Sequence, residues 1–122
     1  MIKNLLIIFI LLSTTVLAYP IIISQEGTDH QKNKELIYSI PKNNFKYVEI
    51  VEFRSKPIKH NNKIYQGYAY VYWDYYHNCY KGKIEIYNYI ILSHELGHIY
   101  DLCVRKNNKT TEEFANGFNL WK

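Results

Sequence analysis

The sequence of 122 residues contains no block of more than three like charges, and its formal net charge is only +4. Lysine is spread along the chain, as on an ordinary solvated surface. Nucleic-acid-binding domains gather their basic residues on one face, so we expect no nucleic-acid partner. Internal repeats and a second hydrophobic domain are also absent, which predicts a single small domain.

Cysteine is scarce, and this limits the metal sites that the chain can build. Its two cysteines, Cys79 and Cys103, lie far apart in the sequence. A cysteine-rich zinc site needs closely spaced cysteine pairs, so that class of site is excluded. In an exported protein, two such cysteines are expected to form a disulfide, and the alternative is two free buried thiols. A Cys79–Cys103 bridge would stabilise the fold by roughly 3 kcal/mol.

One long hydrophobic run is present, and it lies at the N-terminus. Lys3 precedes the apolar residues 5–12, and residues 16–18 are small or apolar, which is the pattern of a secretory signal. We therefore predict a signal peptide at residues 1–18 and a mature domain at 19–122. The apolar character continues to residue 23, so an uncleaved segment would be long enough to anchor the chain in a bilayer. We expect a secreted monomer that contacts a membrane only if this segment is retained.

The periodicity of the apolar residues changes along the chain. Alternation with period two predicts strands at residues 45–53, 64–73 and 83–87, whereas residues 24–33 and 74–81 are expected to be loops. Asn61 and Asn62 mark the tip of a turn, and Pro41 ends a short helix. Helical periodicity begins at Asn88, an N-cap, and runs to about residue 105. A last helix is expected after it, with Glu112 and Glu113 in its first turn. Its buried stripe is formed by Phe114, Phe118 and Trp121. The predicted fold is α+β, with a small three-stranded, mostly antiparallel sheet packed on the long helix and the C-terminal helix.

The long helix contains the sequence His94-Glu95-Leu96-Gly97-His98. Residues four apart lie on the same face of a helix, so both imidazoles can bind a single metal ion. Glu95 lies beside that face and can reach a water molecule on the metal. Two histidines with one further protein ligand leave the fourth position of a zinc ion open for this water, whose pKa falls to about 7. The motif therefore predicts a zinc-dependent hydrolase.

The motif also has less specific interpretations. The same pattern occurs by chance on solvated helices, and a zinc site can be degenerate or inactive. Here the flanking residues 89–92 and 99–100 are mostly apolar, so the helix is expected to pack in the core. Buried imidazoles and carboxylates need partners, which favours the metal site over a chance match.

The third ligand is expected to be a carboxylate. No histidine follows His98, which excludes the metzincin arrangement with its third histidine. Glu112 and Glu113 on the last helix are candidates. Asp101 is a rival because it lies seven residues after His94 on the same face, although one straight helix rarely supplies three ligands. The preferred role of Asp101 is to accept a hydrogen bond from a metal ligand or to form a salt bridge at the end of the helix.

Residues 112–118 resemble the ligand-bearing helix of the gluzincin metallopeptidases. In that class a glutamate ligand is followed four residues later by an acid or asparagine that orients a zinc-bound histidine, which implies Glu112 as ligand and Asn116 as its support. Together with residues 94–101, this segment is most similar to the family of the anthrax lethal factor catalytic domain and the secreted Pro-Pro endopeptidases. Asn116 departs from the family by replacing an acid. The resemblance covers roughly the last 35 residues and implies a zincin-like fold.

The function implied by these observations is that of a secreted zinc-dependent endopeptidase. Zn²⁺ is the expected cofactor, a protein or peptide is the expected substrate, and Glu95 is the general base. By resemblance, the strand at residues 83–87 is the sheet edge that pairs with the peptide. Tyr100, Tyr87, His77 and several other tyrosines are candidates for stabilising the oxyanion, and the sequence does not choose among them. The alternative is a catalytically weak or inactive zinc-binding interaction module on a peptidase fold.

Overall fold

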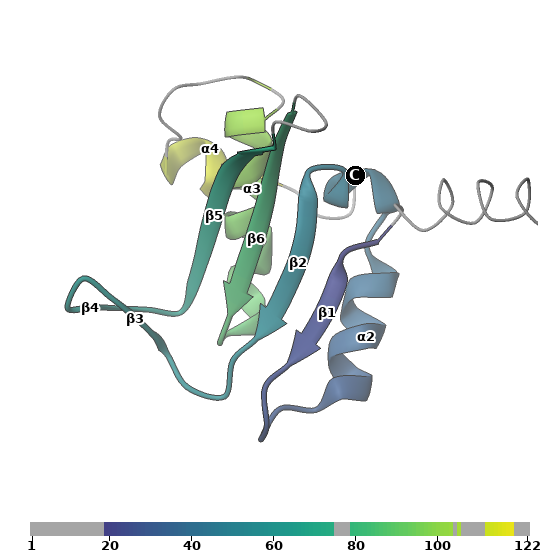
Figure 1. Cartoon of the computed structure of the whole chain (residues 1–122), viewed down its shortest axis with the longest axis vertical. Helices are drawn as coiled ribbons and strands as arrows, with labels where there is room; N and C mark the ends of the chain where they lie inside the picture. The colour runs from purple at the N-terminus through teal and green to yellow at the C-terminus, as the bar shows by residue number, and fades with distance from the viewer. Residues whose placement is uncertain (1–18, 75–78, 104, 106–111, 119–122) are drawn as a thin grey trace, which may run out of the picture.

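A four-stranded mixed sheet forms the centre of the structure, with the strand order β1-β2-β6-β5 (Figure 1). This computed structural model describes residues 19–74, 79–103, 105 and 112–118. β1 pairs with β2 and β2 with β6 in parallel, whereas β6 and β5 are antiparallel. The strands span Ile21–Ser24 (β1), Val48–Phe53 (β2), Gly67–Asp74 (β5) and Cys79–Ile86 (β6).

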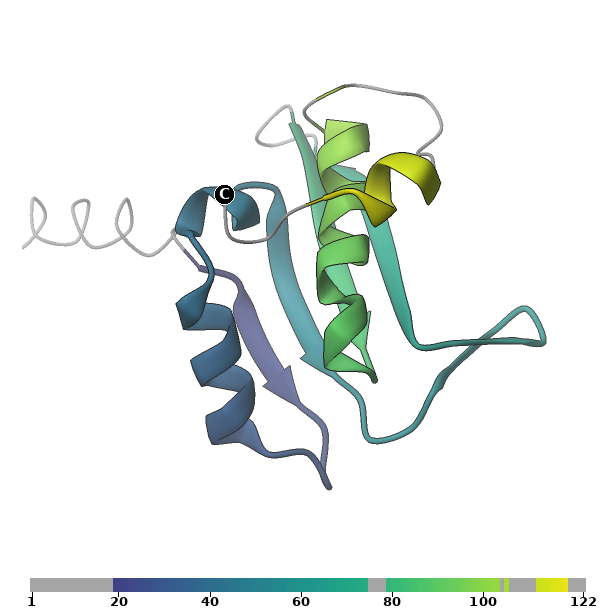
Figure 2. The same ribbon diagram turned by 180° about the vertical axis from the view of Figure 1, so that it is seen from behind.

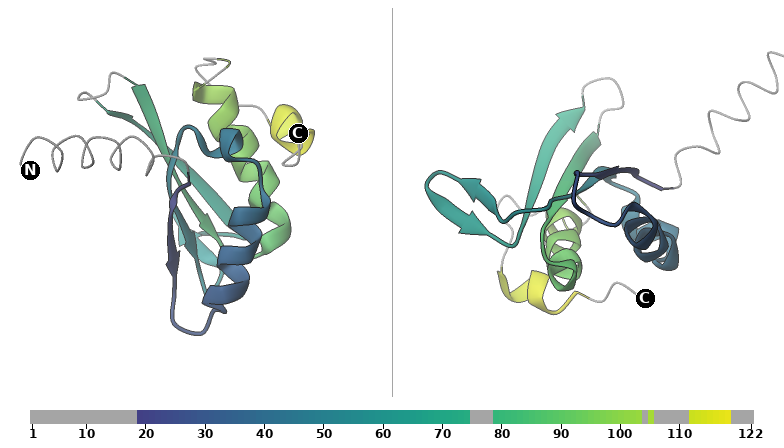
Figure 3. Two further views of the ribbon diagram at one scale, coloured as in Figure 1. Left: turned by 90° about the vertical axis from the view of Figure 1, so that its right-hand side faces the viewer. Right: turned by 90° about the horizontal axis from the view of Figure 1, so that it is seen from below.

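The helices lie on one face of this sheet (Figures 2 and 3). α2 packs beside β1, α3 packs across β5 and β6, and α4 packs on α3 rather than on the sheet. Two single turns of 3-10 helix and a small hairpin complete the described part of the chain. The remaining elements are α2 (His30–Ser39), η2 (Lys42–Phe45), β3 (Ile58–His60), β4 (Lys63–Tyr65), η3 (Tyr89–Ile91), α3 (Leu92–Cys103) and α4 (Glu112–Asn116).

The core lies between the sheet and α3. Alternate strand residues such as Val51 and Ile84 point toward the helices and are completely buried. Leu92, Leu96 and Ile99 supply the opposing stripe of α3 and are exposed by 2% or less. A Cβ on Gly82 would lie 2.5 Å from Ile99 Cδ1, so α3 sits directly on the backbone of β6 at this point. This packing fixes the rotation of α3 about its axis and thereby decides where its polar residues point.

The predicted α+β class is confirmed, but the predicted sheet is wrong in two respects. It has four strands rather than three, and two of its three pairings are parallel. The additional strand, β1, lies in an apolar run that also fits the end of a membrane or signal segment. A run of this length has no periodicity that separates these alternatives, and its pairing with β2 is a long-range contact.

Several element boundaries also differ from expectation. α2 begins at His30, within a segment expected to be a loop, because the Asp29 side chain accepts a hydrogen bond from the Lys32 amide and caps the helix. Asn88 caps the 3-10 turn η3 instead of α3 itself. β5 and β6 extend into the segment 74–81 that was expected to be a loop.

The turn at residues 61–62 is where the sequence places it. Asn61 and Asn62 have φ values of 49° and 63°, and they join β3 and β4 in a two-residue hairpin turn. Both central residues of such a turn need positive φ, which asparagine tolerates better than most residues. This hairpin projects from the sheet beside the start of β5 (Figure 1).

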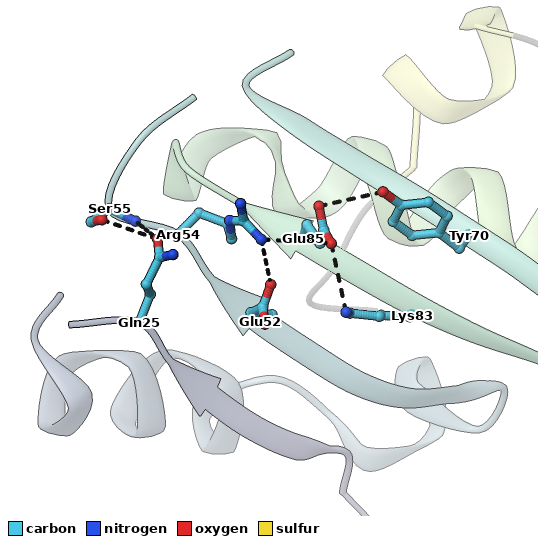
Figure 4. A network of polar contacts seen from close by, with 7 residues as sticks. All are labelled: Gln25, Glu52, Arg54, Ser55, Tyr70, Lys83 and Glu85. Atoms are coloured by element: carbon cyan, nitrogen blue, oxygen red, sulfur yellow. Dashed lines mark hydrogen bonds and ion pairs between the residues drawn. The ribbon is translucent and has the colours of Figure 1, made fainter. Parts of the chain in front are cut away.

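The sheet face opposite the helices carries a network of polar contacts (Figure 4). Arg54 Nη1 lies 2.9 Å from Glu52 Oε2 and 3.9 Å from Glu85 Oε1, and Lys83 Nζ lies 3.6 Å from the same Glu85 oxygen. The Tyr70 hydroxyl donates to Glu85 Oε2. Glu85 is buried, and the two nearby cations compensate its charge on this open face of the sheet.

Some predictions fall on parts of the chain outside this description. The signal segment 1–18, His77 and Trp121 lie outside the described residues. The side chain of Cys79 also lies outside the description, whereas Cys103 is buried at the end of α3. The disulfide between them therefore stays a prediction. Among the helices of the described ranges, none has the length and apolar character needed to cross a membrane.

Candidate metal centre

α3 places His94 and His98 one above the other, one helical turn apart. Their Nε2 atoms are 2.9 Å apart, and the exposed fractions of the two side chains are only 16% and 12%. The core stripe of α3 turns this histidine face toward α4 and away from the centre of the sheet. The local geometry predicted from the motif is therefore present.

Glu112 joins the two histidines from the separate helix α4. Its Oε2 lies 2.9 Å from His94 Nε2, and its Oε1 lies 3.1 Å from His98 Nε2. The ligand atoms of all three residues lie within 4.8 Å of one another, close enough to bind one metal ion. Ligands about 2.0–2.1 Å from a tetrahedral ion are about 3.4 Å apart, so the observed separations are near those of a metal site.

Asn116 determines which nitrogen of His94 faces this group. Its Oδ1 lies 2.8 Å from His94 Nδ1 and can only accept, so Nδ1 carries the proton. Neutral His94 then directs the lone pair of Nε2 toward Glu112. Lone pairs of imidazole and carboxylate that face each other at this distance repel unless a cation or proton lies between them. The donor set thus fits a bound cation, and Asn116 makes the contact with His94 that the resemblance implies.

The rival carboxylates lie elsewhere. Asp101 is completely buried and its Oδ1 forms an ion pair with Arg105 Nη1 at 3.3 Å. Arg105 in turn lies over the Phe114 ring, 4.2 Å from its centroid, and so links the end of α3 to α4. Glu113 is exposed, and the convergent group includes neither acid. The helix-end ion pair predicted for Asp101 is confirmed.

Gly97 allows α4 to approach α3 closely enough to deliver Glu112. A Cβ at this position would lie 2.8 Å from Ala115 Cα and 2.9 Å from Phe118 Cβ. Next to this contact, the Tyr100 ring stacks on Phe114 at a centroid distance of 6.0 Å and packs at a tilt on Phe118 at 5.4 Å. The glycine of the motif therefore has a packing function that the two histidines do not reveal.

We expect Gly97→Ala to weaken metal binding by about tenfold or more, because α4 must move away from α3. Overpacking of this kind costs about 1–3 kcal/mol, which exceeds the roughly 1 kcal/mol that alanine gains over glycine in a helix. Gly117→Ala is the matched control, since its nearest atoms would lie at an ordinary 3.8 Å. Zinc titration against a competing chelator measures both variants, and equal affinities would contradict this account.

Glu95 lies on the inner side of the histidine face and is exposed by only 6%. Burial raises the pKa of Glu95 to about 7; His94 opposes this shift and Glu112 adds to it. Burial also lowers the pKa of His98 from its usual value, against the opposite influence of Glu112. A carboxyl group that titrates near neutrality and a neutral imidazole suit a general base beside a metal ligand.

We expect the stability of the metal-free protein to reveal the shifted pKa of Glu95. Between pH 4.5 and about pH 7 the folded state holds a proton that the unfolded state has lost. The free energy of unfolding therefore falls as the pH rises through this range, by up to roughly 3 kcal/mol. Glu95→Gln lacks this titration, so its stability relative to the wild type should increase with pH. Denaturant unfolding of both chelated proteins at pH 5 and pH 8.5 measures the difference, and a constant difference would exclude the shift.

A cleft of about 590 Å³ lies beside the convergent residues. One wall is formed by η3, α3 and α4, including Ile91, Glu95 and Leu102. The other is formed by residues 64–69 of β4 and β5. β5 is the outer strand of the sheet next to this cleft. The predicted peptide-binding edge at residues 83–87 lies in β6 except for its last residue, and β6 pairs on both sides. The prediction of that edge is therefore wrong, because strand order is not visible in the sequence of a single strand.

Residues 64–69 were not predicted to belong to the site. One signal was available, since Gly67 interrupts a run of strand-forming residues and such a glycine often marks a close backbone approach. A Cβ on Gly67 would lie 2.5 Å from Ile91 Cγ2 and 3.2 Å from Glu95 Cγ. Of the oxyanion candidates, Tyr87 and Tyr100 do not line the cleft, whereas two other tyrosines, Tyr65 and Tyr68, do.

Comparison with known proteins adds no relative to these observations. No protein-family model matches the chain, and no significant match was found among curated proteins or solved structures.

Proposed function

We propose that this chain is a secreted zinc-dependent endopeptidase. The observation that carries the proposal is the convergence of His94, His98 and Glu112 within 4.8 Å, next to the buried Glu95 and at the side of a cleft. A metal group alone would support a structural role. The carboxyl group and the cleft beside it support hydrolysis of a bound substrate.

The donor set favours zinc among the biological metals. Imidazole ligands suit zinc, copper, iron and nickel better than magnesium or calcium. Two histidines and one glutamate are the ligands of a well-known class of catalytic zinc sites, which keep a further position open. A zinc ion bound here would polarise a carbonyl group and lower the pKa of a bound water molecule to about 7.

The residues of the chain then have distinct roles. Glu95 accepts a proton from the attacking water and passes it to the nitrogen of the leaving amine. A dication nearby favours the ionised form of Glu95, which offsets the effect of burial on its pKa. Asn116, which accepts from His94 Nδ1, would leave Nε2 of His94 free to bind the metal ion. The outer edge of β5 offers backbone groups to an extended peptide.

The proposal is tested by combining metal analysis with a hydrolysis assay. The mature protein is expressed, its zinc content is determined by elemental analysis, and it is incubated with a mixed peptide library whose products are identified by mass spectrometry. We expect one zinc ion per chain and cleavage that stops with a chelator and returns with added zinc. Zinc without cleavage would favour the interaction module, and a protein without zinc would refute the metal centre.

A further inference from the structure

We infer that the cleft binds an extended peptide with a bulky apolar side chain beside the scissile bond, and that Ile64 of the β3–β4 hairpin helps to select it. The inference rests on the proposed function, since it names the substrate class of the same site. Three independent features carry it: the backbone of β5, the packing around Gly67 and the composition of the cleft wall.

The backbone of β5 presents hydrogen-bonding groups along the cleft. The Tyr87 amide donates to the Gln66 carbonyl at 2.9 Å, so Gln66 faces β6. In an antiparallel ladder the residues alternate in direction, and Gly67 and Ala69 therefore turn their N–H and C=O groups outward. β5 has no neighbour on that side among the described strands. These groups can pair with an extended peptide, and its side chains would then alternate between the two faces of the sheet.

The packing around Gly67 places an apolar side chain next to the proposed base. Ile91 lies directly against the Gly67 backbone, and Glu95 lies beside it. A peptide that pairs with β5 at this point brings a side chain from the helix face of the extended sheet toward Ile91. This location is adjacent to Glu95 and therefore to the bond under attack.

Ile64 completes this wall from the hairpin. It lines the cleft although its exposed fraction is 69%, which is high for an isoleucine. Leu102 adds apolar surface farther along α3, and no lysine or arginine is among the described lining residues. An acidic substrate side chain would lose hydration here without gaining a basic partner. An apolar side chain would instead bury surface that both partners otherwise expose to water.

The test compares Ile64→Ser with Ile90→Ser. Ile90 is exposed by 85%, lies next to Ile91 in η3 and does not line the cleft, so it is a matched control. The zinc-loaded wild type and both variants are given the peptide library, and the residues flanking each cleaved bond are counted. Peptides with leucine, serine or aspartate at the preferred position are then compared by kcat/KM. Their Kd values for the zinc-loaded Glu95→Gln protein, alone or combined with either variant, are measured by fluorescence anisotropy.

We expect the wild type to prefer the leucine peptide over the aspartate peptide. Ile64→Ser should lower kcat/KM and binding affinity for the leucine peptide by about five- to tenfold and leave both quantities nearly unchanged for the serine peptide. Ile90→Ser should change neither quantity for either peptide.

Cleavage without an apolar preference, or equal effects of both variants, would overturn this inference while the proposed function stands. The leucine peptide could instead bind in a way that depends on Ile64 without being cleaved by the wild type. That result would overturn the proposed function and support the inference that the cleft selects an apolar side chain. Absence of both binding and cleavage would overturn both.

Discussion

Glu95→Gln should lower the rate of peptide hydrolysis about 10²–10⁴-fold while the protein retains its metal ion. Glutamine has nearly the same shape but cannot accept the proton of the attacking water. The convergent group of His94, His98 and Glu112 does not include Glu95, so the proposed metal ligands are preserved. Single-turnover hydrolysis of a library-derived peptide, with zinc content determined on the same sample, measures both quantities.

The control for this prediction is Glu85→Gln. Glu85 is also a buried carboxylate, exposed by 8%, but it lies in the polar network on the opposite face of the sheet (Figure 4). Its substitution removes a buried charge and can lower stability without changing the chemistry of the cleft. Glu95→Gln protein that contains zinc and still hydrolyses peptide at the wild-type rate would refute the assigned role of Glu95.

Glu112→Ala should weaken zinc binding by more than the roughly 10–100-fold that loss of a supporting hydrogen bond costs. The substitution removes the only carboxylate in the convergent group and leaves two histidines, which do not complete the three-ligand set of a catalytic zinc site. Titration against a chelator of known affinity gives the dissociation constant, and hydrolysis should be lost in parallel.

Glu113→Ala is the matched control, because Glu113 is the adjacent exposed acid on the same helix and lies outside the convergent group. It should bind zinc as the wild type does. Reversed results, with Glu113 needed and Glu112 dispensable, would show that α4 presents its other acid to the metal. Unchanged binding in both variants would redirect the search for the third ligand to Asp101.

The contrast between Glu112 and Glu113 illustrates the limit of the sequence. Both acids lie in the first turn of α4, and the sequence alone left Glu112, Glu113 and Asp101 open. The choice depends on the rotation of α4 against α3, which is set by the contact of Gly97 with Ala115. That contact joins separate elements of the chain, and no local pattern encodes it. The family resemblance implied the same residue that the packing brings to the histidines.

The peptide-binding edge shows a similar limit. Three of the four strands of the sheet were visible as alternating segments, yet their order was not, and an internal strand was expected at the edge. Parallel pairing of β1 and β2 links residues far apart in the sequence, and its stability comes from contacts that form only in the folded state. The cleft wall at residues 64–69 follows from this order, which explains why sequence reasoning missed it.

The sequence by itself determined the pairing of His94 with His98, the position of Glu95 beside them and the turn at Asn61 and Asn62. Each of these depends on the geometry of one helix or one turn, which repeats at a known period regardless of the rest of the chain. Only the tertiary structure decided which acid completes the group, which strand borders the cleft and which apolar side chains line it. These features depend on how close-packed elements meet, and that packing is a property of the whole core.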